Sequence, residues 1–249
     1  MNNLLNVKKI SYKNIFNNLS FNIPEKSFSI LIGKNGVGKT TLVYAILELI
    51  KYEGEIKFKY KRSDIGCISD YTEINKDTVF AYLSEPLRNL NYSEDKINKT
   101  IYSISKRLSL DNIINKHKNE LNKEEELMIL LAHAVIHNPK LVIIDNTLDE
   151  LRESIKLRFL NYIRSMKSTV IFVTNDSRYF KYGNRLLIMN ESKIEVIKDS
   201  NSINKLENIL VKNNSELPFY LELSSKLYSY GIIKELYSNG SELVDNIWN

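Results

Sequence analysis

The segment Gly33-Lys34-Asn35-Gly36-Val37-Gly38-Lys39-Thr40 separates two stretches with different hydrophobic patterns. The preceding residues 28–32 are mostly apolar, which is typical of a buried strand, and residues 42–49 place their apolar side chains on one helical face. In a loop between a strand and a helix, backbone N–H groups and the positive helix end can surround a phosphate. The segment therefore predicts a phosphate-binding loop.

Each residue type in this loop has a physical role. Gly33, Gly36 and Gly38 permit the backbone angles and the close approach that a bound phosphate requires. Lys39 supplies a cation to the outer phosphates, and Thr40 supplies a hydroxyl to Mg²⁺. The alternative is a glycine-rich turn that binds nothing. The nucleotide-binding residues predicted in this segment are Gly33, Lys34, Asn35, Gly36, Val37, Gly38, Lys39, Thr40 and Thr41.

A magnesium–nucleotide site also needs an acid at the end of a neighbouring buried strand. Asp145 directly follows the continuous apolar run Leu141-Val142-Ile143-Ile144. A carboxylate at this position can hold Mg²⁺ through a metal-bound water. The alternative is an Asp that ends a strand and caps a turn. We therefore predict that Thr40 and Asp145 support Mg²⁺.

Composition limits the class of protein. The chain has 249 residues, of which 43% are hydrophobic, enough for one substantial core or for a large and a small domain. The formal net charge of +5 comes from basic residues interleaved with acidic ones, which favours a solvated surface and no nucleic-acid partner. The single Cys67 excludes an internal disulfide. No apolar run reaches the ~20 residues that cross a bilayer, and the first residues lack signal-peptide features, so we expect a cytoplasmic protein.

Periodicity along the chain predicts an α/β protein. Residues 4–32 indicate short strands, and residues 78–135 indicate helices, the first of them capped by Asp77. Apolar strands at 141–144 and 169–173 flank a helical stretch, and strand–helix–strand order implies a parallel sheet covered by helices. Residues 201–249 predict a small appended helical domain, with Ser241 capping its last helix.

The phosphate loop followed by Asp145 makes residues 4–200 resemble the ATP-binding subunit of ABC transporters. This resemblance implies ATP and Mg²⁺ as cofactors and a P-loop NTPase fold of ABC ATPase type. In such a fold, N-terminal antiparallel strands join a mixed sheet, and a helical subdomain covers about residues 72–136. Tyr12 matches the aromatic residue that stacks on adenine in that family, although it could instead be a tyrosine on the sheet surface.

The C-terminal residues 201–249 point to one group within this family. Leu217-Pro218-Phe219, then Leu223, Leu227 and Gly231, then Ser241-Glu242-Leu243-Val244 are similar to the C-terminal domain of energy-coupling factor ATPases. That likeness implies a role in uptake of vitamins or of cobalt or nickel ions. It also implies three partners: a second ATPase, a transmembrane scaffold protein and a substrate-binding membrane protein. The chain would then be peripheral on the inner face of the cell membrane.

Several residues depart from the family pattern around the nucleotide. Asp70 stands where the family has a Gln that senses the γ-phosphate and metal. Asn146 replaces the catalytic Glu after the metal-binding Asp, and Asn175 replaces a His that touches the γ-phosphate. Asparagine cannot accept a proton from an attacking water, and losing a positioned base typically costs ~10²–10⁴ in rate. We therefore expect ATP binding with weak or no hydrolysis at this chain's own site.

The signature loop, Leu-Ser-Gly-Gly-Gln in the family, aligns with Leu121-Asn122-Lys123-Glu124-Glu125. Adjacent acids there are expected to repel the γ-phosphate of the opposite subunit. The family's next conserved loop, Leu-Asp, aligns either with Leu151-Arg152 or with Leu148-Asp149. Because a homodimer would have two damaged sites, we expect a heterodimer with an intact second ATPase.

Other features favour ordinary structural roles. His133 and His137 have the i, i+4 spacing of a zinc pair, but no further ligand accompanies them. Apolar residues of the helical insert, such as Phe80, Leu83 and Leu87, could form a docking groove for a membrane partner or simply pack in the core. Two other functions remain open: a soluble regulatory protein that uses ATP as a structural ligand, and a nucleic-acid-associated ABC ATPase, which the chain is too short to favour.

Overall fold

Strand β3 (Phe28–Ile32) is buried along its whole length and leads into the glycine-rich segment. It belongs to a computed structural model that describes residues 2–69, 72–148, 150–175, 177–190, 193–197, 219–233 and 240–247. The chain forms two compact units. We call Met1–Lys57 with Phe172–Asn249 the loop unit, and Phe58–Ile171 the helical unit.

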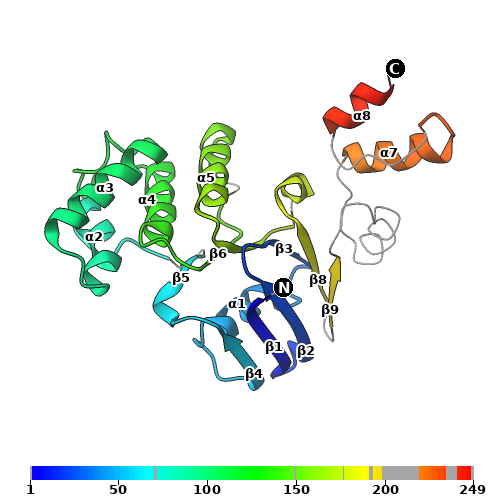
Figure 1. Cartoon of the computed structure of the whole chain (residues 1–249), viewed down its shortest axis with the longest axis horizontal. Helices are drawn as coiled ribbons and strands as arrows, with labels where there is room; N and C mark the ends of the chain where they lie inside the picture. Colours follow the sequence, from blue (N-terminus) through cyan, green and yellow to red (C-terminus); the bar gives the residue numbers. More distant parts are fainter. Residues whose placement is uncertain are drawn as a thin grey trace. The chain divides into compact units, whose positions relative to one another are not determined.

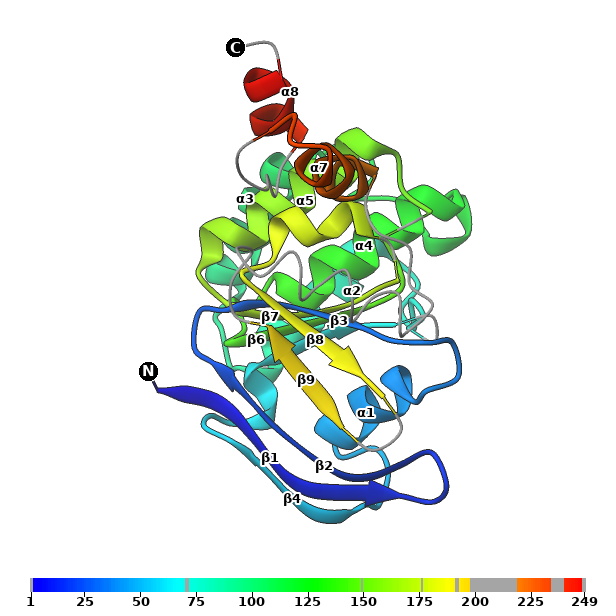
Figure 2. The same cartoon turned by 90° about the vertical axis from the view of Figure 1, so that its right-hand side faces the viewer.

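The loop unit contains an antiparallel sheet of strand order β2-β1-β4, formed by β1 (Asn3–Tyr12), β2 (Phe16–Pro24) and β4 (Glu53–Phe58). Figure 2 shows these three strands side by side. The register of β1 on β2 shifts between Val7 and Ile10, where Lys9 adopts a positive φ. The N-terminal strands expected from the sequence are therefore present and antiparallel.

A mixed arrangement of strands carries the glycine-rich segment. Strand β3 pairs in parallel with β8 (Arg185–Met189), and β8 pairs antiparallel with β9 (Ile194–Ile197). The end of β7 (Thr169–Val173) is tied to β3, because the Thr174 amide donates to the Leu31 carbonyl. Helix α1 (Lys39–Ile46) follows the glycine-rich segment, as its hydrophobic pattern predicts.

The helical unit pairs β5 (Ile65–Ile68) in parallel with the fully buried β6 (Leu141–Asp145). Helices α2 (Val79–Asn89), α3 (Glu94–Leu108), α4 (Lys123–Val135) and α5 (Glu153–Met166) pack against one another (Figure 1). Their apolar faces form its core, which includes Leu83 and Leu87 of α2. These two residues therefore pack in the interior rather than line a docking groove.

The predicted helix starts differ from the observed ones by small amounts. Thr78, rather than Asp77, is the N-cap of α2, because the Thr78 Oγ1 accepts the Ala81 amide at 3.2 Å. The last helix, α8 (Gly240–Ile247), begins one residue before Ser241. Asn138 adopts a left-handed φ of 55° just before Pro139, beyond the end of α4, as expected for a helix stop at Asn138-Pro139.

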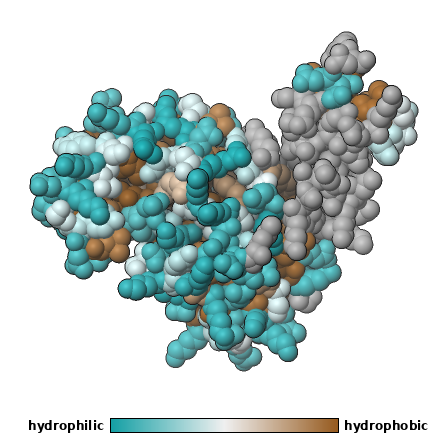
Figure 3. Space-filling model, viewed as in Figure 1, coloured by the Kyte–Doolittle hydropathy of each residue, from teal (hydrophilic) through white to brown (hydrophobic). Residues whose placement is uncertain are grey.

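In the tail, α7 (Phe219–Ser229) packs against α8, and Leu243 is buried. Much of the predicted C-terminal domain, including Pro218, lies outside the described residues, so its extent stays a prediction. None of the helices in the described ranges combines the length and apolarity of a membrane span. The face in Figure 3 is mostly hydrophilic, with hydrophobic residues scattered over it.

Candidate functional site

The shape of the glycine-rich loop depends on glycine at specific positions. A Cβ atom on Gly33 would lie 2.6 Å from the carbonyl oxygen of Met189, at the end of β8. Gly36 and Gly38 adopt φ values of 80° and 100°, which L residues with side chains rarely adopt. Gly38 is also the N-cap of α1. The conformation of the main chain therefore requires glycine at these positions.

Lys39 spans this loop from the first turn of α1. Its Nζ donates to the carbonyl oxygens of Gly33 at 2.7 Å and Lys34 at 3.1 Å, and the residue is only 6% exposed. A buried ammonium held by backbone carbonyls supplies a fixed positive charge at the helix N-terminus, where an anion is also favoured by the helix dipole. The donor set fits a phosphate group.

Asn175 lies against the same loop. Its Nδ2 donates to the Asn35 Oδ1 at 2.7 Å, and its Oδ1 accepts the Gly33 amide at 3.4 Å. The segment after β7 is held beside β3 by the Thr174 amide bond to Leu31, which brings Asn175 to the loop. This amide side chain is exposed and carries no titratable group.

Tyr12 borders a cavity of about 800 Å³ in the loop unit. The residues lining it are Ser11, Tyr12, Lys13, Asn14, Ile15, Phe16, Asn17, Lys51, Tyr52 and Glu53. A Cβ atom on Gly38 would meet Ile15 and Phe16, so this cavity wall touches the phosphate loop. The Lys13 Nζ lies 5.0 Å from the centroid of the Tyr12 ring. A cavity of this size fits a drug-sized molecule, and an aromatic ring with a nearby cation fits a nucleobase.

Asp145 and Asn146 belong to the helical unit. Asp145 ends β6 and is 2% exposed. Burial, and then the nearby Asp145 carboxylate, raise the pKa of the Cys67 thiol to about 12, which makes this residue an inert core thiol on β5. Asn146 follows with a φ of 54° and is exposed. Asparagine tolerates this left-handed conformation better than most residues.

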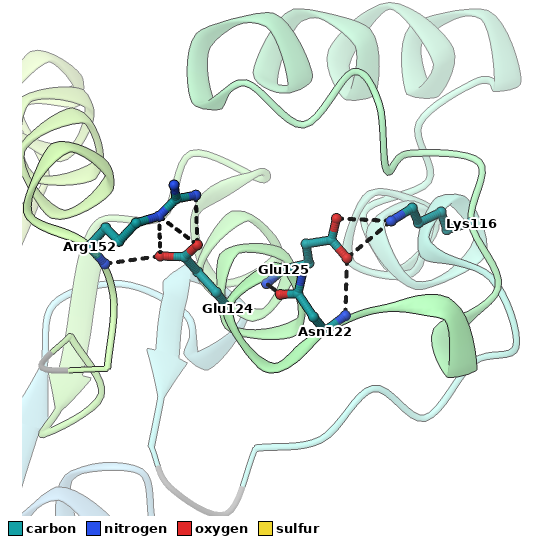
Figure 4. Close-up of polar contacts among 5 residues, drawn as sticks. All are labelled: Lys116, Asn122, Glu124, Glu125 and Arg152. Carbon is teal, nitrogen blue, oxygen red and sulfur yellow. Dashed lines mark hydrogen bonds and ion pairs between the residues drawn. The ribbon is translucent and has the colours of Figure 1, made fainter.

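The segment aligned with the signature loop forms a capped helix start (Figure 4). Asn122 is the N-cap of α4: its Oδ1 accepts the Glu125 amide at 2.9 Å, while the Glu125 Oε2 accepts the Asn122 amide at 3.0 Å. This reciprocal pair is a capping box. Glu124, Glu125 and Glu126 all lie in the first turn, where the helix dipole favours carboxylates.

Two of these carboxylates are also paired with cations, and Figure 4 shows them turned toward different partners. The Lys116 Nζ donates to Glu125 at 2.9 and 3.1 Å. The Arg152 backbone amide and Nε donate to Glu124 Oε1, each at 3.0 Å, and its Nη2 lies 2.8 Å from Oε2. Hydrogen bonds from Lys116 and Arg152 hold the pKa of Glu125 and of Glu124, respectively, below the usual range. The α4 N-terminus is thus already supplied with intramolecular anions.

The two histidines of the predicted zinc spacing have a structural setting. The His133 ring stacks on the Tyr82 ring at a centroid distance of 4.0 Å, and burial lowers the pKa of His133 to about 4. Burial also lowers the pKa of His137. Within the described residues, no group of three His, Cys, Asp or Glu side chains is placed to hold a metal ion. His133 therefore packs between α4 and α2 rather than binding a metal with His137.

The predicted residues divide between the two units. The loop unit brings together the phosphate loop, Tyr12 and Asn175, while the helical unit holds Asp145, Asn146 and the Leu121–Glu125 segment. Asp70 and Asp149 lie outside the described residues. Sequence reasoning missed Lys116 as a partner of Glu125. It also missed Arg152 as a partner of Glu124, because 28 positions separate them and no local pattern signals the contact.

Comparisons with known proteins agree on one family. The sequence profile of the ABC transporter family matches residues 16–149, more than half of the chain. The energy-coupling factor transporter ATP-binding protein EcfA1 of Ureaplasma parvum is 24% identical, covering 94% of this chain and 85% of its own length. EcfA of Malacoplasma penetrans is also 24% identical, covering 94% of this chain and 88% of its own.

Solved structures share the fold. An ATP-binding subunit of an ABC transporter matches with a TM-score of 0.76 at 18% identity, covering 85% of this chain and 99% of its own. CbiO1 of Clostridium perfringens, part of the ABC transporter complex CbiONQ, matches with a TM-score of 0.71 at 20% identity, covering 88% and 97%. The expected α/β fold is thereby confirmed.

Proposed function

This chain belongs to the ABC transporter family, and from that premise we propose that it is the ATP-binding subunit of an energy-coupling factor importer. Its cargo would be a vitamin or a metal-ion micronutrient, as the resemblance of the tail implies. The observation that carries the proposal is Lys39 lying across a phosphate loop that adjoins the Tyr12 cavity.

The residues that we assign to the nucleotide itself all belong to the loop unit. Backbone amides of residues 36–41 and the Lys39 ammonium would hold the phosphates. Tyr12 would pack on adenine in the adjoining cavity, with Lys13 beside the ring. Mg²⁺ neutralises phosphate charge when bound, and we assign Thr40 and Asp145 to it from the sequence pattern. Thr40 lies in the first turn of α1, and Asp145 is buried at the end of β6.

Hydrolysis at this chain's own site would be weak. Neither Asn146 nor Asn175 can take a proton from water. Both side chains are exposed. The start of α4, which the family uses to contact the nucleotide of the opposite subunit, carries the capped and ion-paired Glu124 and Glu125 instead. We therefore propose a heterodimer whose partner supplies the catalytic Glu and His.

The first experiment measures binding of Mg·ATP to the purified full-length chain by calorimetry. We expect Lys39→Ala to weaken binding at least about tenfold, which corresponds to about 1.4 kcal/mol. Lys8→Ala, which removes the same charge from an exposed position on β1, is the matched control and should bind as the wild type. If the Lys39→Ala variant and the wild type bound Mg·ATP with equal affinity, the proposal would be wrong.

One second function has support from a specific observation. The ion-paired, capped start of α4 fits a regulatory protein that uses ATP as a structural ligand and never contacts a second nucleotide. Isolation of the tagged chain from membranes distinguishes the two. An importer subunit will copurify with another ATPase and with a membrane-spanning protein, whereas a regulator will not.

A further inference from the structure

A groove of about 490 Å³ lies in the helical unit, and none of the residues lining it is assigned above to nucleotide or Mg²⁺. It is bounded by α3, by the segment after α4 and by α5, and α3 and α5 are in contact (Figure 1). The residues lining it are Lys96, Lys99, Thr100, Ser103, Ile104, Arg107, Ile136, Asn138, Tyr162, Ser165 and Met166. The set contains three cations and no carboxylate.

Some basic residues of the helical unit have acidic partners. Lys116, Lys123 and Arg152 are each paired with a glutamate. Among the described residues, none of the groove's three cations is paired with an acid of the same groove, because no acid lines it. Arg107 instead lies over the Tyr162 ring at 5.9 Å. The groove therefore carries uncompensated positive charge, which favours an anionic occupant.

The spacing of the cations indicates the shape of that occupant. Lys96, Lys99, Ser103 and Arg107 follow one another at intervals of three or four residues along one face of α3. At 1.5 Å per residue, Lys99 and Arg107 stand about 12 Å apart along the helix. A single phosphate group cannot reach both positions, whereas a polypeptide segment can place a carboxylate beside each.

Apolar residues complete the lining. Ile104 and Ile136 are buried, and the half-buried Tyr162 and Met166 supply the apolar surface that the groove exposes beside its cations. A flat anionic bilayer would contact only the outward cations and leave this surface unused. An amphipathic segment with apolar residues between acidic ones would use both.

We propose that this α3–α5 groove is a docking site for an acidic, amphipathic segment of a partner polypeptide, bound by Lys96, Lys99 and Arg107 beside Tyr162 and Met166. The proposal concerns a different surface from the nucleotide site, and it does not depend on whether the chain hydrolyses ATP. Its partner is defined by chemistry: carboxylates spaced by about two helical turns, with apolar side chains between them.

The probe is a fluorescein-labelled helical peptide with two glutamate pairs about 12 Å apart and leucines between them. Its binding to the full-length protein is followed by fluorescence anisotropy. The expected result is saturable binding that weakens with salt, because ion pairs at an open groove are screened. Reversing both charges in Lys99→Glu/Arg107→Glu should lower the affinity at least about tenfold.

Lys106→Glu is the matched control, because Lys106 is exposed on α3 but does not line the groove. Its affinity for the probe should stay within about twofold of wild type. Binding of Mg·ATP should be unchanged in every variant. This result would show that the variants are folded and that the peptide effect does not arise at the nucleotide site.

Three outcomes would overturn the proposal. The first is an equal loss of affinity in Lys106→Glu, which would show that the peptide is attracted by the overall positive charge of the surface rather than by the groove. The second is equal binding of a peptide of the same composition with its glutamates clustered at one end. The third is binding of phosphatidylglycerol vesicles that Lys99→Glu/Arg107→Glu abolishes while the peptide does not bind, which would assign the groove to a lipid surface.

Discussion

Residues of the proposed nucleotide site differ in how strongly the packing around them limits which side chain can stand there. Gly33 has no room for a side chain, because the Met189 carbonyl lies where a Cβ atom would stand. Asn146 and Asn175 are exposed, and their side chains can change without disturbing the core. The loop geometry therefore depends on packing within the fold, whereas packing does not determine which side chain stands at positions 146 and 175.

Replacement of Gly33 by alanine is expected to destabilise the protein. The new Cβ would lie 2.6 Å from a backbone oxygen of β8, so that strand must shift, at a cost of about 2 kcal/mol. Gly36→Ala is the comparison, since no atom lies within 4 Å and only its φ of 80° opposes alanine, at about 1 kcal/mol. Urea unfolding of both variants measures the difference. A larger loss in Gly36→Ala would contradict the packing argument.

Replacement of Asn146 by glutamate is expected to restore a proton acceptor. In the complex with its partner ATPase, Asn146→Glu combined with Asn175→His should raise ATP turnover at this site at least about tenfold. Glutamate at a φ of 54° should cost about 1 kcal/mol of stability, because that conformation disfavours most side chains. Asn146→Gln with Asn175→His is the control, having the same length without the base. Equal turnover in the two double variants would show that the missing carboxylate does not limit the rate.

At the scale of elements, α4 shows what the sequence could and could not predict. Its apolar periodicity predicts the helix over 127–134, and the structure extends it to Lys123–Val135. Acids at 124 and 125 are visible in the sequence, but their ion pairs are not. Arg152 lies 28 positions and Lys116 nine positions from its glutamate, so only the tertiary fold brings them together. The same limit applies to Lys39, whose carbonyl partners depend on how the loop closes.

The packing of α2 on α4 predicts a pH dependence of stability. Burial lowers the folded-state pKa of His133 from 6.5 to about 4, and Glu85 opposes this while His137 adds to it. Between those values the unfolded chain binds a proton that the folded chain excludes, so stability falls as pH drops. The loss is at most about 3 kcal/mol.

Urea unfolding at pH 7 and at pH 5 tests this dependence. His133→Phe keeps an aromatic ring against Tyr82 and removes the titrating group, so its stability should change less between the two pH values. Some slope should remain, because the pKa of His137 is lowered as well. A slope as steep as that of wild type would assign the effect to other groups.

At the scale of the whole molecule, the fold class followed from a few local patterns. A strand, a glycine-rich turn and a helix, together with an acid after a buried strand, were enough to predict the α/β fold that the solved structures share. The division of the predicted site residues between two compact units could not be predicted from the sequence. Hydrophobic periodicity predicts helices and strands, but it does not show which unit each one belongs to. Membership of the family therefore came from the sequence, and the internal contacts came from the structure.

The proposed heterodimer predicts a difference between the chain alone and the chain in its complex. The purified chain should bind Mg·ATP with little turnover, and the material copurified from membranes should hydrolyse ATP at a rate set by the partner. Mutation of the partner's own phosphate-loop lysine should abolish most of that turnover, whereas Lys39→Ala in this chain should reduce it less. Turnover by the isolated chain at the rate of the complex would contradict the heterodimer.

The contact between Gly33 and the Met189 carbonyl has a consequence for how this protein can change over generations. A heritable change at Gly33 must also rearrange the strand beside it, so selection for folding alone preserves glycine at this position. Exposed catalytic side chains have no such protection. During evolution, this lineage should therefore lose ATP hydrolysis long before it loses ATP binding.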